Sequence, residues 1–315
     1  MIETSQVYFN PDAQWLLNLV LASMILGVAL DIKMQDFRQV AKKPKAIGAG
    51  LIAQFILLPA TTLLLTLSLD LPAGVELGMM LVAACPGGAI SNFVTHLSGG
   101  NTALSISMTA IASALSIFML PFNFLFWSQF NEPASSFLTR IDVNTQGIVI
   151  SLLFVLAVPL ALGLIVKHKF PNSAKKAHKV LNVTSTLALI GFIAIAVIRN
   201  QHSFLVYFNL MFAVVLIHNA VAFALGFFAG KLASLNNRDV KATTIEVGMQ
   251  NSSLALAIIF TQFDGQAGMA LISAFWGTWH IVSGLSIALV FRLLMKAQKV
   301  DPLNANHPAK HNNQG

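Results

Sequence analysis

The chain carries very little charge for its length. Of its 315 residues only 10% are Asp, Glu, Lys or Arg, whereas 56% are apolar, and the mean hydropathy is +0.73. Because about a quarter of the residues of a soluble domain are charged, this composition excludes an ordinary soluble protein. The apolar residues occur in runs long enough for a helix to cross about 30 Å of hydrocarbon. The sequence therefore predicts an all-α polytopic membrane protein.

Cysteine and the common catalytic motifs are also scarce. Cys85 is the single cysteine, which excludes an intramolecular disulfide framework and a cysteine-based metal cluster. The sequence contains no Walker motif, no Gly-x-Ser-x-Gly and no His-Glu-x-x-His, so the common signatures of nucleotide hydrolysis and of hydrolases are missing. Any energy source must therefore be an ion gradient, which favours a secondary active transporter over an enzyme.

Nine hydrophobic spans are predicted. They cover residues 15–31, 46–69, 77–98, 101–127, 146–166, 180–198, 205–229, 240–263 and 266–292. With the N-terminus outside, only Arg140 and Arg199 of the 19 Lys and Arg residues fall on the outer side, as the positive-inside rule expects. The net charge of +7 therefore reflects membrane topology, and no nucleic-acid partner is expected.

No connection is long enough to separate two soluble domains, so residues 1–300 are expected to form one transmembrane unit. Residues 301–315 are polar and are expected to be a disordered cytoplasmic tail. No cleavable signal peptide is apparent, because residues 1–14 contain no Lys or Arg. The expected location is the cell inner (plasma) membrane, as a multi-pass protein in the lipid bilayer, and no obligate protein partner is evident.

Two of the nine spans are interrupted. Cys85-Pro86-Gly87-Gly88 lies inside the third span, and Gly248-Met249-Gln250-Asn251 lies inside the eighth. Proline removes a helical donor and glycine weakens a helix, so both helices are expected to open there. The two interrupted spans are five places apart in the order of spans, and five is odd, so the two helices must cross the membrane in opposite directions. This arrangement predicts inverted repeats, in which paired breaks indicate the binding site. A five-span unit used twice would give ten spans, so the first helix of a ten-helix plan is absent.

Glu246 is the one acidic residue expected well inside a span. A carboxylate at this depth is a functional-site hypothesis; the alternative is a buried Glu satisfied by a neighbouring hydrogen bond. Oxygen-bearing groups gather in the same regions, and hard cations prefer oxygen ligands. They are Gln54, Ser91, Asn92, Gln250 and Asn251, with Ser105 and Thr109 on one helix face and the carbonyls of Val247 and Met249. Together they predict one or two sites for sodium.

The half-helices that begin after the breaks predict an anionic substrate. They should start near Ala89–Ser91 and near Asn251–Ser252, where free amide groups and the positive end of the helix dipole attract anions. Asn251 can donate to a carboxylate, and His280 can line the same cavity. His96, His218 and His280 have no spacing typical of a metal site.

The segments CPGGAISN, GNTALSISMT and IEVGMQNSS resemble the bile acid:sodium symporter family in this order and spacing. The resemblance runs over most of residues 15–295. It implies a carrier in which a panel domain moves against a core domain holding two crossed, discontinuous helices. It also implies two coupling sodium ions. The first site would use Ser91, Asn92, Ser105, Thr109 and Glu246, and the second would use Gln54, Glu246, Val247, Met249 and Gln250.

The resemblance implies a substrate site as well. Asn251 matches a residue that faces substrate in the family, and His280 matches a histidine near the same cavity. Ala89 and Ile90 stand where some relatives have a Thr before the Ser-Asn pair, which removes a hydroxyl from the expected wall. Bile acids, keto acids and pantoate-like carboxylates therefore all stay open as substrates.

Sodium-coupled import of such an anion by alternating access is the leading hypothesis, and three others compete with it. In a proton-coupled carrier, Glu246 would take up a proton. A passive channel or sensor would use the broken helices only to shape a site, and an arsenite-type exporter would use Cys85 as a soft ligand. An intramembrane enzyme is disfavoured, because the sequence shows no activated nucleophile paired with a base.

Overall fold

The computed structural model describes residues 14–32, 42–140, 145–199 and 205–300. The described residues form helices and no strand, apart from one isolated β-bridge. The helices are α1 (Gln14–Asp31), α3 (Pro44–Ile52), the π-helix η2 (Ala53–Leu57), α4 (Leu58–Leu69), α5 (Ala73–Ala84), α6 (Ala89–Leu97), α7 (Thr102–Ser128), α8 (Glu132–Arg140), α9 (Thr145–Lys169), α10 (Pro171–Arg199), α12 (Phe208–Leu232), α13 (Asn237–Gly248), α14 (Ser252–Gln262) and α15 (Ala267–Val300). The predicted tail, 301–315, lies outside the described residues.

Each predicted hydrophobic span coincides with one helix, with a pair of helices or, for 46–69, with the three consecutive elements α3, η2 and α4. Among the described residues, four continuous helical segments are long and apolar enough to cross a membrane. They are Pro44–Leu69, Thr102–Ser128, Phe208–Leu232 and Ala267–Leu294. The segment Pro44–Leu69 consists of α3, η2 and α4, which follow one another without a gap. The two interrupted spans appear as the pairs α5/α6 and α13/α14, which confirms the predicted openings.

Three features of the helices were not predicted. The outer connection contains α8, and α10 begins at Pro171, well before the expected start at 180. The rod over Pro44–Leu69 contains the π-helical turn η2 immediately before Pro59. Proline has no amide hydrogen for the helical ladder, so the preceding turn widens, and single π-turns are frequent at functional sites. Gln54 lies in this turn.

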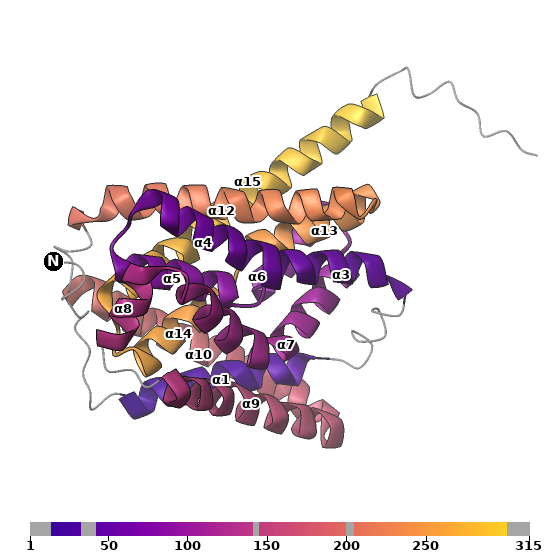
Figure 1. Ribbon diagram of the computed structural model, residues 1–315. Coiled ribbons are helices and arrows are strands. Elements are labelled where there is room, and N and C mark those ends of the chain that lie inside the picture. Colours follow the sequence, from indigo (N-terminus) through magenta and orange to yellow (C-terminus); the bar gives the residue numbers. More distant parts are fainter. Residues whose placement is uncertain (1–13, 33–41, 141–144, 200–204, 301–315) are drawn as a thin grey trace, which may run out of the picture.

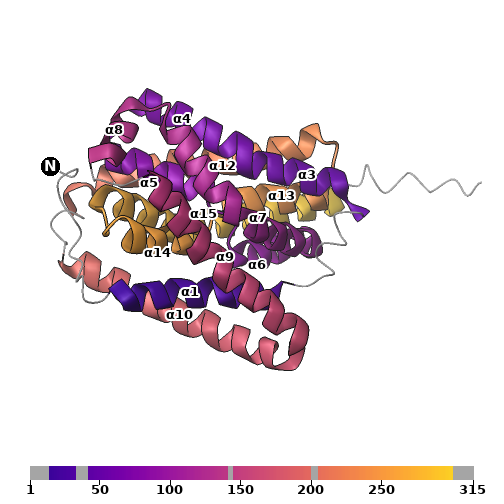
Figure 2. The ribbon, with the colours of Figure 1, turned by 60° about the horizontal axis from the view of Figure 1, so that its bottom comes forward.

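The helices pack in two groups. The helix α1 contacts α9 and α10, and these three lie together along the lower edge of Figure 1. Figure 2 shows α1 running beside α10. In the second group α12 packs on α13, and α5 packs on α15 and α7. The interrupted helices therefore lie inside the larger group, and α14 and α7 contact α1 and α9 across the boundary between the groups.

Candidate functional site

The two helix breaks meet in the interior. Helix α5 ends at Ala84 and α13 ends at Gly248, and each chain then runs extended for a few residues. Gly88 N donates to Met249 O (2.9 Å) and Asn251 N donates to Pro86 O (2.9 Å), which forms an antiparallel bridge between Gly87 and Gln250. Non-helical backbone deep in a membrane protein needs partners within the protein. The two breaks supply partners to each other.

Glu246 lies beside this junction with its carboxylate almost fully buried, at 2% exposure. Three hydroxyl groups donate to it. Ser91 Oγ lies 2.6 Å and Ser105 Oγ 3.0 Å from Oε2, and Thr109 Oγ1 lies 2.6 Å from Oε1. The donors come from α6 and α7, far from Glu246 in the sequence. No Lys or Arg among the described residues forms an ion pair with it.

A second polar group lies next to the first. Gln54 Nε2 donates to Gln250 Oε1 (2.6 Å) and to Cys85 O (2.8 Å), and Gln250 Nε2 donates to Val247 O (2.6 Å). The side chains of Gln54 and Gln250 are buried. This group therefore connects the π-turn η2 with both breaks.

The structure brings most of the expected ion-binding residues together in these two groups. Asn92 joins the first group through Thr109 Oγ1, 3.3 Å from its Oδ1. The carbonyl of Met249, expected in the second group, accepts the amide of Gly88. The carboxylate of Glu246 is hydrogen-bonded to side chains of the first group, and its expected share in the second stays a prediction.

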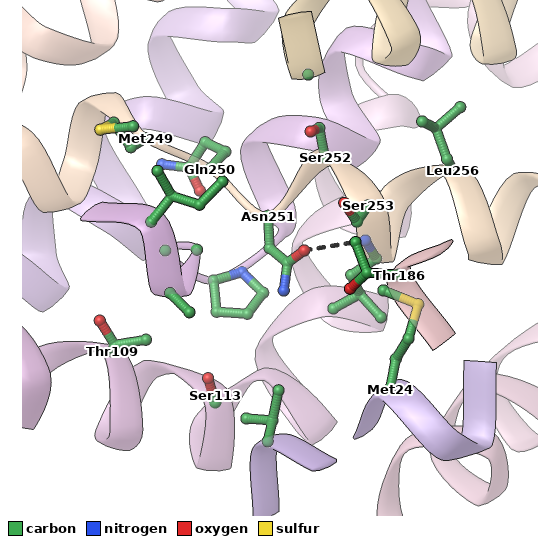
Figure 3. Close-up of a pocket in the computed structure, with 18 of the residues that line it drawn as sticks. Met24, Thr109, Ser113, Thr186, Met249, Gln250, Asn251, Ser252, Ser253 and Leu256 are labelled. Carbon is green, nitrogen blue, oxygen red and sulfur yellow. Dashed lines mark hydrogen bonds between the residues drawn. The ribbon is translucent and has the colours of Figure 1, made fainter. Parts of the chain in front are cut away.

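A cavity of about 770 Å³ opens beside the junction and is lined by residues of both groups of helices. All four residues expected near substrate line it: Ala89, Ile90, Asn251 and His280. Asn251 caps α14, since its amide oxygen accepts from Leu254 N (3.0 Å), and its amide nitrogen points away from this bond toward the side of Ser113 (Figure 3). No Lys or Arg occurs among the described lining residues.

Several polar lining residues were not predicted: Ser113, Ser116, Asn182, Thr186, Ser253 and Thr278. Ser113 could have been found, because it follows Thr109 by four residues and so continues the helix face of Ser105 and Thr109. Asn182 and Thr186 lie on α10, which carries no break and in which other polar residues, such as Thr184 and Ser185, are common. Only packing of α10 against the interrupted helices brings them to the cavity.

The side chains of His218, His280 and Cys85 lie outside the two polar groups. His218 contacts Thr62 Oγ1 (2.7 Å) and the edge of Trp276, and His280 Nδ1 lies 2.7 Å from Trp276 O. Cys85 is buried and is not among the residues that line the cavity. Among the described residues no three His, Cys, Asp or Glu side chains gather as a metal site.

Comparison with known proteins decides the family. Residues 18–207 match the Sodium Bile acid symporter family. The chain belongs to this family. It is therefore a multi-pass membrane protein of a transporter family and not an enzyme.

Relatives come from bacteria, plants and animals. The uncharacterized sodium-dependent transporter YocS of Bacillus subtilis is 31% identical over 290 residues, which cover 92% of this chain and 87% of that protein. The human ileal sodium/bile acid cotransporter is 25% identical over 247 residues, 78% of this chain and 69% of the relative. The probable sodium/metabolite cotransporter BASS1 of Arabidopsis thaliana is 28% identical over 273 residues, 85% of this chain. This chain spans 64% of the length of that plant relative.

Proposed function

We propose that this family member is a sodium-coupled symporter that imports a small organic anion by alternating access. Two sodium ions drive the import. The chain crosses the inner membrane nine times, with its N-terminus outside and its C-terminus in the cytoplasm. The three relatives described above are named as sodium-dependent transporters or sodium cotransporters, which supports sodium as the coupling ion.

The observation that carries this proposal is the buried carboxylate of Glu246 among three hydroxyl groups. A buried carboxylate is costly unless a counter-charge compensates it, and no basic side chain among the described residues does so. A hydroxyl that donates its hydrogen to a carboxylate keeps lone pairs for a cation. Ser91, Ser105 and Thr109 can therefore hold sodium together with Glu246, and Asn92 Oδ1 completes the first site.

The second site uses the neighbouring amide group. Gln54 and Gln250 contribute side-chain oxygens, Val247 and Met249 contribute carbonyl oxygens, and Glu246 contributes charge. Val247 O and the two glutamines are already hydrogen-bonded to one another, so they lie within the small volume that one ion requires. Sodium would replace the hydrogen bond between Gln250 Nε2 and Val247 O.

Substrate binds in the cavity on the other side of the junction. The amides of Ala89 and Ile90 at the start of α6 have no acceptor among the described residues, and Ser253 N lies in the first turn of α14. These free amides and the helix dipoles favour an anionic group. Since no Lys or Arg occurs among the described lining residues, backbone amides and Asn251 Nδ2 carry the recognition of a carboxylate. Bile acids, keto acids and pantoate-like carboxylates all fit this chemistry.

The architecture is an inverted repeat of crossed helices. The unit α5–α6–α7 and the unit α13–α14–α15 have the same order, a 12-residue helix, a break, a short helix and a long helix. Each unit also touches the other in the same way. Asn101 N, before α7, donates to Arg238 O at the start of α13, and Gln266, before α15, lies against Gly74 at the start of α5.

The position of the cavity between the two helix groups supports alternating access. The helices α1, α9 and α10 form a panel domain, and the interrupted helices belong to a core domain. Movement of one group against the other would expose the junction to each side of the membrane in turn, while the ion sites stay within the core.

Uptake by the purified protein in proteoliposomes tests this function. Radiolabelled taurocholate, pantoate and 2-oxoisovalerate are offered in turn with an inward sodium gradient, with a pH gradient in sodium-free buffer, and with neither. We expect one of these anions to accumulate against its gradient only with sodium. Accumulation driven by the pH gradient alone would indicate a proton-coupled carrier, and equilibration without accumulation would indicate a channel.

A further inference from the structure

A line of buried hydroxyl groups continues from Glu246 toward one end of the core. Ser105 Oγ donates to Glu246 Oε2, and Thr95 Oγ1 in turn donates to Ser105 Oγ (3.3 Å). Both hydroxyl groups are fully buried, at 0% exposure. Thr95 belongs to neither ion site. Its hydroxyl therefore extends the polar environment of the first site by one further step.

The line ends at the turn between α6 and α7, which faces the side predicted to be cytoplasmic. Ser98 Oγ donates to Thr95 O (2.8 Å), and Gly100 N donates to Ser98 Oγ (3.2 Å). Lys241 Nζ then donates to Ser98 O (3.2 Å). The hydrogen bonds fall into three steps, which are joined within Thr95 and Ser98 because each of these residues contributes both its hydroxyl and its carbonyl oxygen. Oxygen atoms are thus spaced along the way from the carboxylate to the ammonium group.

Lys241 is unusual for a lysine because only 7% of the residue is exposed. Its Nζ lies 5.4 Å from the centroid of the Phe291 ring, and no carboxylate among the described residues pairs with it. The nearby Asp239 is already bound to Lys43 (2.6 Å), Asn101 and Asn236. The aromatic face and the carbonyl end of α6 attract the ammonium group but do not neutralise it. A net positive charge therefore stands at the end of the line.

We propose that this line is the route by which the coupling cation passes between Glu246 and the cytoplasm, and that Lys241 is its gate. Thr95 and Ser98 supply the oxygen atoms that a partly dehydrated cation needs along the way. The ammonium of Lys241 occupies the last oxygen, Ser98 O, and repels an approaching cation. Passage requires the Lys241 side chain to leave Ser98 O, so the gate limits sodium exchange when no substrate moves. The inference rests on the proposed sodium site at Glu246.

The route is tested by the rate of substrate-independent exchange of radioactive sodium across proteoliposomes. In Lys241→Met the charge is lost while most of the length of the side chain is kept, and we expect exchange to become about tenfold faster, because a repelling charge has gone. Lys241→Arg keeps the charge and should exchange at the parent rate. Lys231→Met is the matched control, because Lys231 also lies over an aromatic ring, Phe227, but stands at the exposed end of α12.

A second variant acts in the opposite direction. Thr95→Val removes one oxygen and keeps the shape, so exchange should become about tenfold slower, as expected for the loss of one polar contact with a charge. Thr95→Ser should restore the rate. Sodium-dependent thermal stabilisation, measured for each variant, shows that the ion site itself is intact, since a ligand that binds the folded state raises its melting temperature.

The results separate the gate from the ion site. Faster exchange in Lys241→Met together with slower exchange in Thr95→Val supports the proposal. If either rate stays within about twofold of the parent rate, which is well below one tenfold step, while sodium still stabilises the protein, the route is overturned. If sodium stabilises neither the parent protein nor the variants, the sodium site itself has failed, and with it the proposed function.

Discussion

Gln54 and Gln250 form a reciprocal amide pair in the interior. Gln54 Nε2 lies 2.6 Å from Gln250 Oε1, and Gln250 Nε2 lies 3.2 Å from Gln54 Oε1. The pair joins the π-turn η2 to the break between α13 and α14. Its geometry depends on the widened turn, because η2 is where the helical ladder before Pro59 is relaxed. The two amides therefore couple a local backbone irregularity to the position of the second break.

The first prediction concerns this pair. Gln54→Leu removes the hydrogen bonds between Gln54 and the buried amide of Gln250. We expect this loss to lower the free energy of unfolding by about 1–3 kcal/mol. The double variant Gln54→Leu/Gln250→Leu removes both amides and should recover part of the loss. Thermal unfolding of the single and double variants without sodium measures the coupling. Additive losses would show that the two amides do not support each other.

The second prediction concerns the charge of Glu246. In Glu246→Gln the shape and most hydrogen-bonding capacity are kept while the negative charge is lost, so the protein should stay folded and sodium affinity should fall at least about tenfold, or 1.4 kcal/mol. Calorimetric titration with sodium checks this. Glu132→Gln, at the exposed start of α8, is the control and should bind sodium as the parent does. Equal sodium affinity in both variants would remove Glu246 from the ion site.

The third prediction concerns the close approach of Gly87 to Glu246. A methyl group at Gly87 would overlap the Glu246 carboxylate, with Oε1 as its nearest atom. Gly87→Ala should therefore displace the carboxylate from its three hydroxyl donors and weaken sodium binding. At Gly48 a methyl group meets no atom within 4 Å, so Gly48→Ala should bind sodium normally. Sodium-dependent shifts of the melting temperature compare the two, and an unchanged shift in Gly87→Ala would contradict the contact.

The fourth prediction separates two roles of Asn251. Its oxygen caps α14, a contribution worth about 1 kcal/mol to helix stability, and its nitrogen is proposed to hold the substrate. Asn251→Ser keeps a capping oxygen and loses the amide donor, whereas Asn251→Ala loses both. We expect both variants to bind substrate about tenfold more weakly, as for a lost hydrogen bond to a charged group, and only the Ala variant to lose stability. Sodium affinity should change much less than substrate affinity, and equal losses of both would argue against separate sites.

The fifth prediction concerns acid stability at the start of α13. Burial by itself raises the pKa of Asp239, but hydrogen bonds from Lys43, Asn101 and Asn236 and the charge of Lys43 outweigh it, so the pKa lies below its ordinary value of 3.8. Because the folded pKa is the lower one, Asp239 stabilises the fold above pH 3.8, and this contribution is lost as the pH falls through the folded value. Asp239→Asn should be less stable than the parent at neutral pH, and the difference should shrink in acid.

Melting temperatures measured across the acidic range check the fifth prediction. The control is Asp264→Asn, since Asp264 is exposed and lies in a left-handed turn that Asn also adopts. A stability difference between Asp239→Asn and the parent that does not vary with pH would show that the carboxylate is not ionised in the folded protein.

Much of the fold was predictable because its signals are local. Pro86 and the glycines after it marked the first break, and the predicted starts of the second half-helices agree with those of α6 and α14. Glu246 stood out because a carboxylate inside an apolar span is costly. The spacing of Ser105 and Thr109 placed both on one helix face, and both donate to Glu246.

Other residues gave no such signal. Gln54 was a candidate ligand, but the π-helical form of its turn left no mark in the sequence. Lys241 and the cavity residues of α10 are also ordinary in sequence, since Lys near a helix end and Asn or Thr in a long helix carry no particular meaning. Lys241 was assigned to the cytoplasmic surface from its place at the edge of a span, yet it is buried against Ser98 and Phe291. Long-range packing of α6 and α15 against α13 buries it.

The sequence by itself determined that the chain is a helical membrane protein, where two of its helices open, and which carboxylate lies within the apolar region. These properties follow from hydropathy, from the missing amide hydrogen of proline and from the cost of burying charge. The family resemblance grouped Ser91 with Glu246 and Gln54 with Gln250, but only the tertiary structure decided the contacts, a hydroxyl on a carboxylate across 155 residues and an amide pair across 196. Such contacts depend on how separate helices pack, and no local sequence pattern shows which residues far apart in the chain come into contact.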